Sequence, residues 1–333
     1  TDHRKITANP VLSQRLSLGE ALYVDAPTDS FGELTFSGLT HKSDYVRISY
    51  QTEMDTVRSL ILEWKLPRPD IVYTFYGTRN NDMVVKNCIR SLIQTTTNNA
   101  TTLVITDGCL EGISPLVSDP AREYWDAYGS DSVTSIAIAP WKEISKNYEL
   151  GASNYLGKHP ATYLMNPENN GYNLDNRINK VLLVDTADED QRNACVDFRI
   201  KFEMMIRDLE GGGRLLSDGD CDDLPNVNVQ VCGIVVSGDQ NTLRSVRSSL
   251  RSNFPYIFIK DSGGLANIIN DCIAERGLGL KVMRKKAITE NFQIDDNFEL
   301  QESSIVRIMR TYWEVIENES EAASMVSDII RNP

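Results

Sequence analysis

The chain has 333 residues, of which 41% are hydrophobic and 24% are charged, and its formal net charge is −13. This length and composition are those of a folded globular protein with a sizeable buried core, so we do not expect an intrinsically disordered chain. The negative charge leaves no general basic surface, so we expect no nucleic-acid partner, and any phosphate ligand must be met by local N–H groups and arginines. No stretch approaches the roughly 18–20 consecutive apolar residues of a membrane span.

Residues 1–69 alternate only weakly between apolar and polar positions and end on the rigid segment Leu66-Pro67-Arg68-Pro69. We therefore expect them to form an N-terminal leader packed on the core. From residue 70 the pattern becomes strand, turn and helix in alternation, which predicts one domain over 70–279. Beyond 280 the pattern is helical, so residues 280–333 are predicted to begin a separate helical region.

Short apolar runs predict strands at 71–76, 102–106, 132–139, 180–185, 229–236 and 255–260. Helical spacing predicts helices at 82–95, 109–128, 189–209, 240–252 and 264–274. Near-continuous apolar strands that alternate with helices indicate an α/β fold, in which a parallel sheet is covered by helices on both faces.

Four of these strands run directly into turns that contain glycine, and in an open parallel sheet the crevice at the carboxyl ends of the strands is where ligands bind. Glycine there lets a ligand approach the backbone, and the following helix N-terminus suits a phosphate. The turns are Tyr76-Gly77-Thr78-Arg79, Thr106-Asp107-Gly108, Ser237 to Thr242, and Ser262-Gly263-Gly264. They predict a nucleotide-type pocket, with plain turns and helix caps as the alternative for each; Asp107 suits either a ribose hydroxyl or a cap.

Residues that would carry catalysis are missing from these turns. The turn at 237–242 is similar to the PGGxGTxxE turn of lysine-decarboxylase-like nucleotide hydrolases, but Ser245 stands where their glutamate would be. The chain has no HExxH and no CxxC motif, and its six cysteines and three histidines lack the spacing of zinc ligands. We therefore expect a binding module without a metal or a covalently attached cofactor, rather than an enzyme.

Six segments taken in order resemble the cytosolic N-terminal homology region of TRPM (melastatin-type transient receptor potential) cation channels. They are LPRPDIVYTFYGT (66–78), TTLVITDGCLEGI (101–113), SIAIAPW (135–141), NKVLLVDTADED (179–190), VCGIVVSGDQNTL (231–243) and FPYIFIKDSGGLANII (254–269). The resemblance spans roughly 66–315, and the tetrapeptides at 138–141 and 182–185 are its most specific parts.

The resemblance implies a Rossmann-like fold of the SLOG superfamily, followed by helical repeats, at the cytosolic base of a homotetrameric calcium-permeable channel. The fragment would then lie on the cytoplasmic side of a membrane and reach the bilayer only through its parent channel. Because the ADP-ribose-gated members bind their ligand between the strand-end loops, we expect ADP-ribose or a related adenine nucleotide here. A ligand-free assembly scaffold and a nucleotide or ribosyl hydrolase are the alternatives.

The resemblance also assigns roles to individual residues. Arg199 matches a family arginine that holds the nucleotide phosphates, Arg192 stands at a ligand-contacting tyrosine, and Gly264 replaces a second phosphate-binding arginine. Gly77 agrees with the TGG turn of the family, whose other two positions are Tyr76 and Thr78 here. The expected ligand contacts are Tyr76, Gly77, Thr78, Arg79, Asp107, Gly108, Arg192, Arg199, Thr242, Ser262, Gly263 and Gly264.

Overall fold

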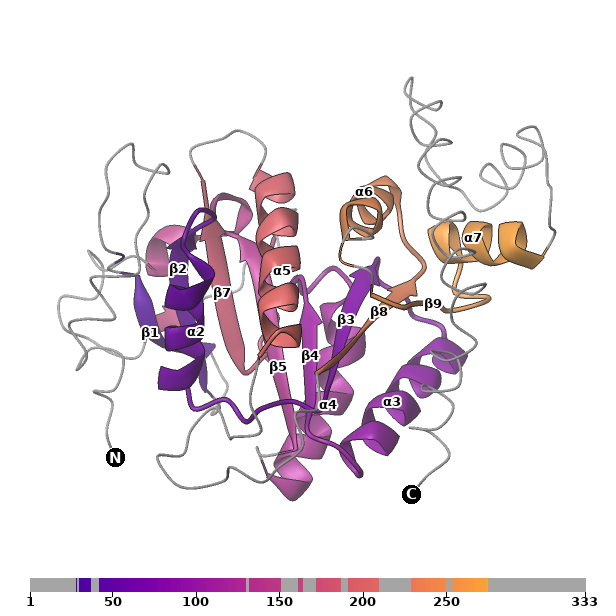
Figure 1. Cartoon of the computed structure of the whole chain (residues 1–333), viewed down its shortest axis with the longest axis horizontal. Coiled ribbons are helices and arrows are strands. Elements are labelled where there is room, and N and C mark those ends of the chain that lie inside the picture. The colour runs from indigo at the N-terminus through magenta and orange to yellow at the C-terminus, as the bar shows by residue number, and fades with distance from the viewer. Residues whose placement is uncertain are drawn as a thin grey trace.

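The structure is a computed structural model that describes residues 28, 30–36, 42–129, 132–150, 161–163, 172–186, 191–209, 229–249, 252 and 254–274. Its centre is a nine-stranded sheet with the order β6-β1-β2-β7-β5-β4-β3-β8-β9 (Figure 1). The strands are β1 (Phe31–Phe36), β2 (Lys42–Ser49), β3 (Ile71–Gly77), β4 (Thr102–Thr106), β5 (Val133–Pro140), β6 (Ala161–Tyr163), β7 (Lys180–Asp185), β8 (Gln230–Val236) and β9 (Tyr256–Phe258).

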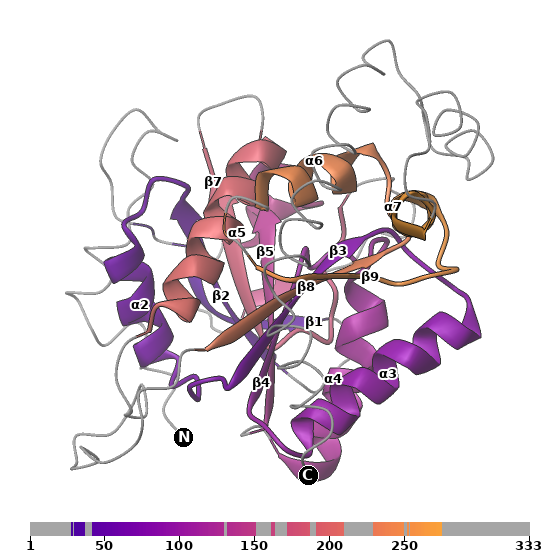
Figure 2. The same cartoon turned by 45° about the vertical axis from the view of Figure 1, so that its right-hand side comes forward.

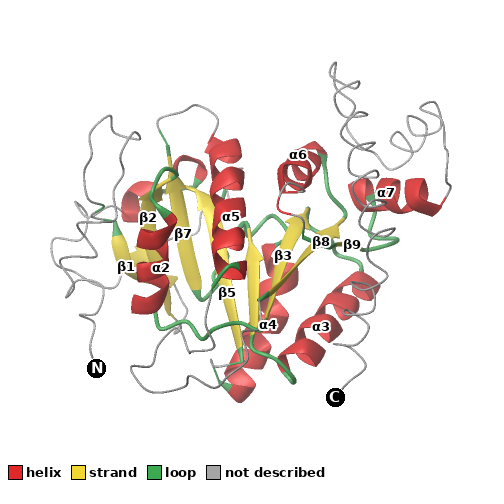
Figure 3. Ribbon diagram, viewed as in Figure 1, coloured by secondary structure: helices red, strands yellow, loops and turns green. Residues whose placement is uncertain are grey.

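The connections between the strands are mostly helical (Figure 3). The α-helices are α2 (Met54–Glu63), α3 (Met83–Thr97), α4 (Ser114–Tyr128), α5 (Gln191–Arg207), α6 (Gln240–Ser249) and α7 (Gly264–Ala274). Two short 3₁₀ turns, η2 (Trp141–Glu143) and η3 (Asn147–Leu150), follow β5.

The helices cover both faces of the sheet, as predicted (Figure 2). Helices α3 and α4 pack on one face, where they meet Tyr73 and Phe75 of β3. Helices α2, α5, α6 and α7 pack on the other face, which receives Val72 and Tyr76 of the same strand. Because side chains alternate across a strand, one continuous apolar run supplies the cores of both layers.

The strand order reverses between β3 and β8. The chain moves from β3 through β4 to β5 in one direction, with α3 and α4 on one face, and later moves from β7 to β8 and β9 in the other direction, with α5 and α6 on the opposite face. Right-handed crossovers require this change of face when the direction changes. The carboxyl ends of β3 and β8 therefore form the switch point, where doubly wound sheets bind their ligands.

The described part of residues 1–69 belongs to the sheet, in contrast to the leader we expected. Strand β2 pairs in parallel with β7, from Asp44 opposite Lys180 to Ser49 opposite Asp185. All strand pairs of the sheet are parallel apart from β1 with β2. Helix α2 buries Val57, Leu60 and Ile61 in the core.

Other boundaries agree with the sequence in varying degree. The predicted elements at 102–106, 180–185 and 264–274 are reproduced residue for residue, whereas the helix expected from 109 begins at Ser114. The region expected over 280–333 lies outside the described residues. Among the helices that the structure describes, none has both the length and the apolarity needed to cross a bilayer.

Candidate functional site

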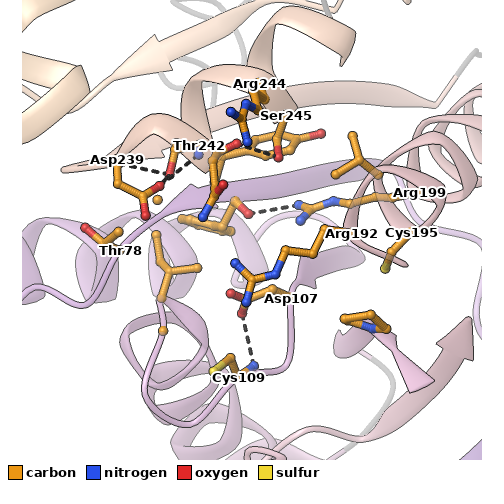
Figure 4. A pocket seen from close by; sticks show the side chains of 18 of the residues that line it. Thr78, Asp107, Cys109, Arg192, Cys195, Arg199, Asp239, Thr242, Arg244 and Ser245 are labelled. Carbon is orange, nitrogen blue, oxygen red and sulfur yellow. Dashed lines mark hydrogen bonds between the residues drawn. The ribbon is translucent and has the colours of Figure 1, made fainter. Parts of the chain in front are cut away.

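A cavity of about 400 Å³ opens at the switch point (Figure 4). Its walls are the loops after β3, β4 and β8, together with the first turns of α5 and α6. Eight of the twelve expected contact residues line it: Tyr76, Gly77, Thr78, Arg79, Asp107, Arg192, Arg199 and Thr242. The other four, Gly108, Ser262, Gly263 and Gly264, are not among the residues that line it.

Gly77 serves the contact between β3 and β8. Its φ is +145°, and a Cβ atom at this position would lie 2.0 Å from the carbonyl oxygen of Val236. On the next residue the Thr78 N–H donates to that same oxygen at 3.3 Å, and the Thr78 hydroxyl accepts the N–H of Gly238 at 3.2 Å. The glycine thus allows two strand-end loops to lock together at the wall of the cavity.

The turn around Gly264 packs against the turn around Gly238 instead of facing the cavity. The N–H groups of Leu265 and Ala266 donate to the carbonyl oxygens of Gly238 and Ser237, both at 2.9 Å. A Cβ atom on Gly264 would lie 2.3 Å from the Gly238 oxygen. The first N–H groups of α7, which we expected to cradle a phosphate, are therefore occupied by the neighbouring loop.

Gly108 has a similar packing role. Its φ is +72°, and a Cβ atom there would lie 2.5 Å from the Cβ of Ala137 on β5. Its N–H donates to the Thr106 hydroxyl at 3.1 Å, and its carbonyl accepts the N–H of Asp175 at 2.9 Å. Absence of a side chain at 108 therefore lets the loop after β4 lie on β5.

Arg199, the expected phosphate anchor, is buried between α5 and the sheet. Its Nε donates to Glu203 Oε1 at 2.9 Å, and its Nη2 donates to the backbone oxygens of Phe75 at 2.9 Å and Ile105 at 3.2 Å. The guanidinium also lies 4.2 Å from the ring centroid of Tyr76. Of the three guanidinium nitrogens of Arg199, only Nη1 has no hydrogen-bond partner among the described residues. Most of the donors of Arg199 are therefore used within the fold, where β3 and β4 end.

Asp107 lies where β4 ends, in the wall of the cavity (Figure 4). Its Oδ1 accepts the N–H of Cys109 at 3.1 Å, and the hydroxyl of Tyr172 donates to its backbone oxygen. Burial raises the pKa of the Asp107 carboxyl to about 6, although the Cys109 N–H and the charge of Arg199 oppose the shift. The group is therefore ionised at neutral pH and becomes protonated under mildly acidic conditions.

Arg192 is the second residue of α5 and lines the same cavity. Its Nε donates to Glu143 Oε2 at 2.7 Å, and its side chain is 59% exposed. Figure 4 labels both Arg192 and Asp107 among the residues that line the cavity. An anionic ligand that binds here would therefore share the Arg192 guanidinium with the Glu143 carboxylate.

Asp239 and Arg244 also line the cavity, and sequence reasoning did not assign them a role there. Asp239 precedes α6, and its Oδ1 accepts both the N–H of Thr242 at 2.9 Å and its hydroxyl at 3.0 Å. An aspartate immediately before a helix is an N-cap signature, which could have revealed this cap. Arg244 lies one helical turn further along α6, on its exposed side.

The two thiols of the cavity, Cys109 and Cys195, are poor nucleophiles. Burial raises the pKa of Cys195 to about 12 and raises that of Cys109 further, with Asp107 adding to the shift at Cys109. Both thiols therefore stay protonated at neutral pH. In the part of the chain that the structure describes, no group of three acidic, histidine or cysteine side chains is placed to hold a metal ion.

A doubly wound sheet with a ligand-sized cavity at its switch point defines a Rossmann-like α/β domain. A family model described as "SLOG in TRPM" matches residues 43–315, so the chain belongs to the SLOG domain family of TRPM proteins.

Three curated relatives illustrate the match, and the chain spans only about one sixth of their length. It is 27% identical to transient receptor potential cation channel subfamily M member-like 2 of Nematostella vectensis, over 73% of this chain and 16% of the relative. It is 25% identical to subfamily M member 2 of Rattus norvegicus, over 74% of this chain and 16% of that protein. It is also 25% identical to subfamily M member 6 of Homo sapiens, over 84% of this chain and 14% of that protein.

Proposed function

We propose that this chain is the nucleotide-sensing domain of a TRPM-type, calcium-permeable cation channel and that it binds ADP-ribose or a related adenine nucleotide. In this proposal the parent channel is a homotetramer, the domain lies on the cytoplasmic side of the membrane, and binding energy is passed to the gate. The observation that carries the proposal is the cavity at the carboxyl ends of β3 and β8, whose volume of about 400 Å³ suits a small ligand.

The charges around the cavity suit a ligand that has both phosphates and sugar hydroxyls. Four arginines line the cavity together with three carboxylates: Arg79, Arg192, Arg199, Arg244, Asp107, Glu111 and Asp239. Guanidinium groups bind phosphate oxygens through charge-assisted hydrogen bonds, and a carboxylate at a strand end binds ribose hydroxyls. Asp107 has one carboxylate oxygen, Oδ2, without a hydrogen-bond partner among the described residues, so it is the candidate for the sugar.

A second candidate function is a ligand-free scaffold for subunit assembly. Two observations favour it: Arg199 is already balanced by Glu203, and the turn around Gly264 is filled by a neighbouring loop. A hydrolase has less support, because Ser245 stands at the position of the catalytic glutamate of the related turn and its hydroxyl donates to the Asn241 carbonyl at 3.0 Å.

Calorimetric titration of the 333-residue chain with ADP-ribose, combined with chromatography of the same mixture, separates these functions. The sensor predicts saturable heat and unchanged ligand. Absence of heat at millimolar ADP-ribose would reject the sensor for this nucleotide and favour the scaffold. Accumulation of a product would instead identify a hydrolase.

A further inference from the structure

The four arginines of the cavity differ in what already neutralises them. Arg199 is paired with Glu203 at 2.9 Å, and Arg192 is paired with Glu143 at 2.7 Å. Among the described residues, Arg79 and Arg244 have no acidic partner; the one hydrogen bond of Arg79 is a 3.5 Å contact from Nε to Asn81 Oδ1. Two uncompensated positive charges thus face the same cavity.

The two uncompensated arginines are carried by loops that the fold locks together. Arg79 directly follows Thr78, whose hydroxyl accepts the N–H of Gly238 at 3.2 Å. Gly238 begins the connection to α6, on which Arg244 lies. In Figure 4, Arg244 and α6 lie across the cavity from Asp107. The cavity therefore has the rim arginines Arg79 and Arg244 on its β3 and β8 side, where Asp239 also lies, and Asp107 on its β4 side.

The N-terminus of α6, which would otherwise attract an anion, already has one. Asp239 caps the helix through the N–H and hydroxyl of Thr242, and its carboxylate faces the cavity. A ligand anion at this point could not use the Thr242 donors, because Asp239 already accepts them, and the negative charge of Asp239 would repel the anion. The helix terminus is thus closed to a ligand phosphate, although the arginine one turn further along is available.

We infer that the phosphates of an anionic ligand are held at the rim of the cavity by Arg79 and Arg244, and neither at the N-terminus of α6 nor by Arg199. The ligand class is a diphosphate, whose two charges match the two free guanidinium groups. The identity of the rest of the ligand rests on the proposed function, but the phosphate position does not. In this arrangement the sugar next to the phosphates extends toward Asp107.

The test is calorimetric titration of the 333-residue chain with two separate probes, ADP-ribose and inorganic pyrophosphate, at one fixed ionic strength. The variants are Arg79→Gln, Arg244→Gln and Asp239→Asn. Arg247→Gln is the matched control, because Arg247 lies on α6 and is not among the residues that line the cavity. Far-ultraviolet circular dichroism and thermal melting verify that each variant is folded.

Each of the two rim variants is expected to weaken the binding of both probes about tenfold, whereas Arg247→Gln changes it less than about twofold. Asp239→Asn keeps a capping side chain but removes a negative charge, so it should tighten binding about threefold. Unchanged affinity in folded Arg79→Gln and Arg244→Gln proteins would overturn the inference while leaving the proposed function standing. If the native chain binds pyrophosphate but not ADP-ribose, and the rim variants lose it, the phosphate position stands and the ADP-ribose assignment falls.

Discussion

Arg199 and Glu203 lie one turn apart on α5 and form an ion pair of 2.9 Å, with side chains that are only 7% and 0% exposed. Glu203 also accepts a hydrogen bond from the Tyr76 hydroxyl at 3.3 Å. The pair therefore joins a helix to the central strand β3 and gives Arg199 a structural role that is independent of any ligand. Substitution of Arg199 alone thus confounds folding with phosphate binding.

Breaking this pair should destabilise the domain. We expect Glu203→Gln to lower the free energy of unfolding by about 3–5 kcal/mol, because it leaves the buried charge of Arg199 uncompensated. The measurement is urea denaturation without ligand. Glu123→Gln is the control: it breaks the exposed pair with Arg90 and should cost less than about 1 kcal/mol. Equal losses in the two variants would contradict a buried structural pair.

Asp107 should make nucleotide binding depend on pH. Burial raises its pKa to about 6, so lowering the pH from 7.5 to 5.5 protonates it and removes a negative charge from the wall of the cavity. The protonated carboxyl is a weaker acceptor for the sugar hydroxyls, so the affinity for ADP-ribose, whose diphosphate diester keeps its charge over this range, should fall several-fold on acidification. Calorimetric titration with ADP-ribose at pH 7.5 and at pH 5.5 measures this change in affinity.

The control for this prediction is Asp107→Asn. This variant should bind at pH 7.5 with the lower affinity that the native chain shows at pH 5.5, and its affinity should vary little with pH. If the variant keeps the full pH dependence, another group is responsible.

Gly264 should be required for folding even without a ligand. An alanine there would place its Cβ 2.3 Å from the Gly238 oxygen, so Gly264→Ala has to separate two packed loops. Gly129→Ala is the matched control, since Gly129 also has a positive φ, +98°, but a Cβ atom there would meet nothing within 4 Å. The control should cost about 1–3 kcal/mol from backbone strain alone, and Gly264→Ala should cost clearly more in ligand-free urea denaturation. Equal costs would show that the close approach to Gly238 is unimportant.

Glu143 should compete with an anionic ligand for Arg192. We expect Glu143→Gln to raise the affinity for ADP-ribose about threefold, since it frees the guanidinium and removes a negative charge next to the cavity. Because Arg192 is 59% exposed, stability should change by less than about 1 kcal/mol. Calorimetry and thermal melting of the variant measure both effects. An unchanged affinity would place the ligand away from the first turn of α5.

The sequence predicted the central strands best. Strands β4 and β7 are continuous apolar runs between polar turns, and this local signal is sufficient for a strand buried on both faces. Strands β1 and β2 lie toward one edge and were missed. Their partners are set by pairings such as Asp44 with Lys180, 136 residues apart, which no local pattern shows.

The site, like the fold, was predicted only where the local sequence carries the signal. The strand-end turns could be found because a parallel sheet brings its carboxyl ends together. The role of each glycine could not be predicted, since the sequence does not show whether a ligand or another part of the chain approaches it. At Gly77 it is the end of β8, and at Gly264 it is the loop around Gly238. Arg244 was missed because a single arginine on a helix gives no signal until the fold brings it to a cavity.

The pairing of β2 with β7 has a consequence for where the folding unit can be cut. A shortened chain that began at residue 70 would keep every helix around the cavity but would turn β7 into an open edge, with the backbone groups of alternate residues, such as Leu183, unpaired on that side. Exposed apolar edges of this kind promote strand-to-strand aggregation. The pairing also joins segments more than 130 residues apart, so it adds a slow, long-range step to folding, and β2 cannot take its place until β7 has been synthesised.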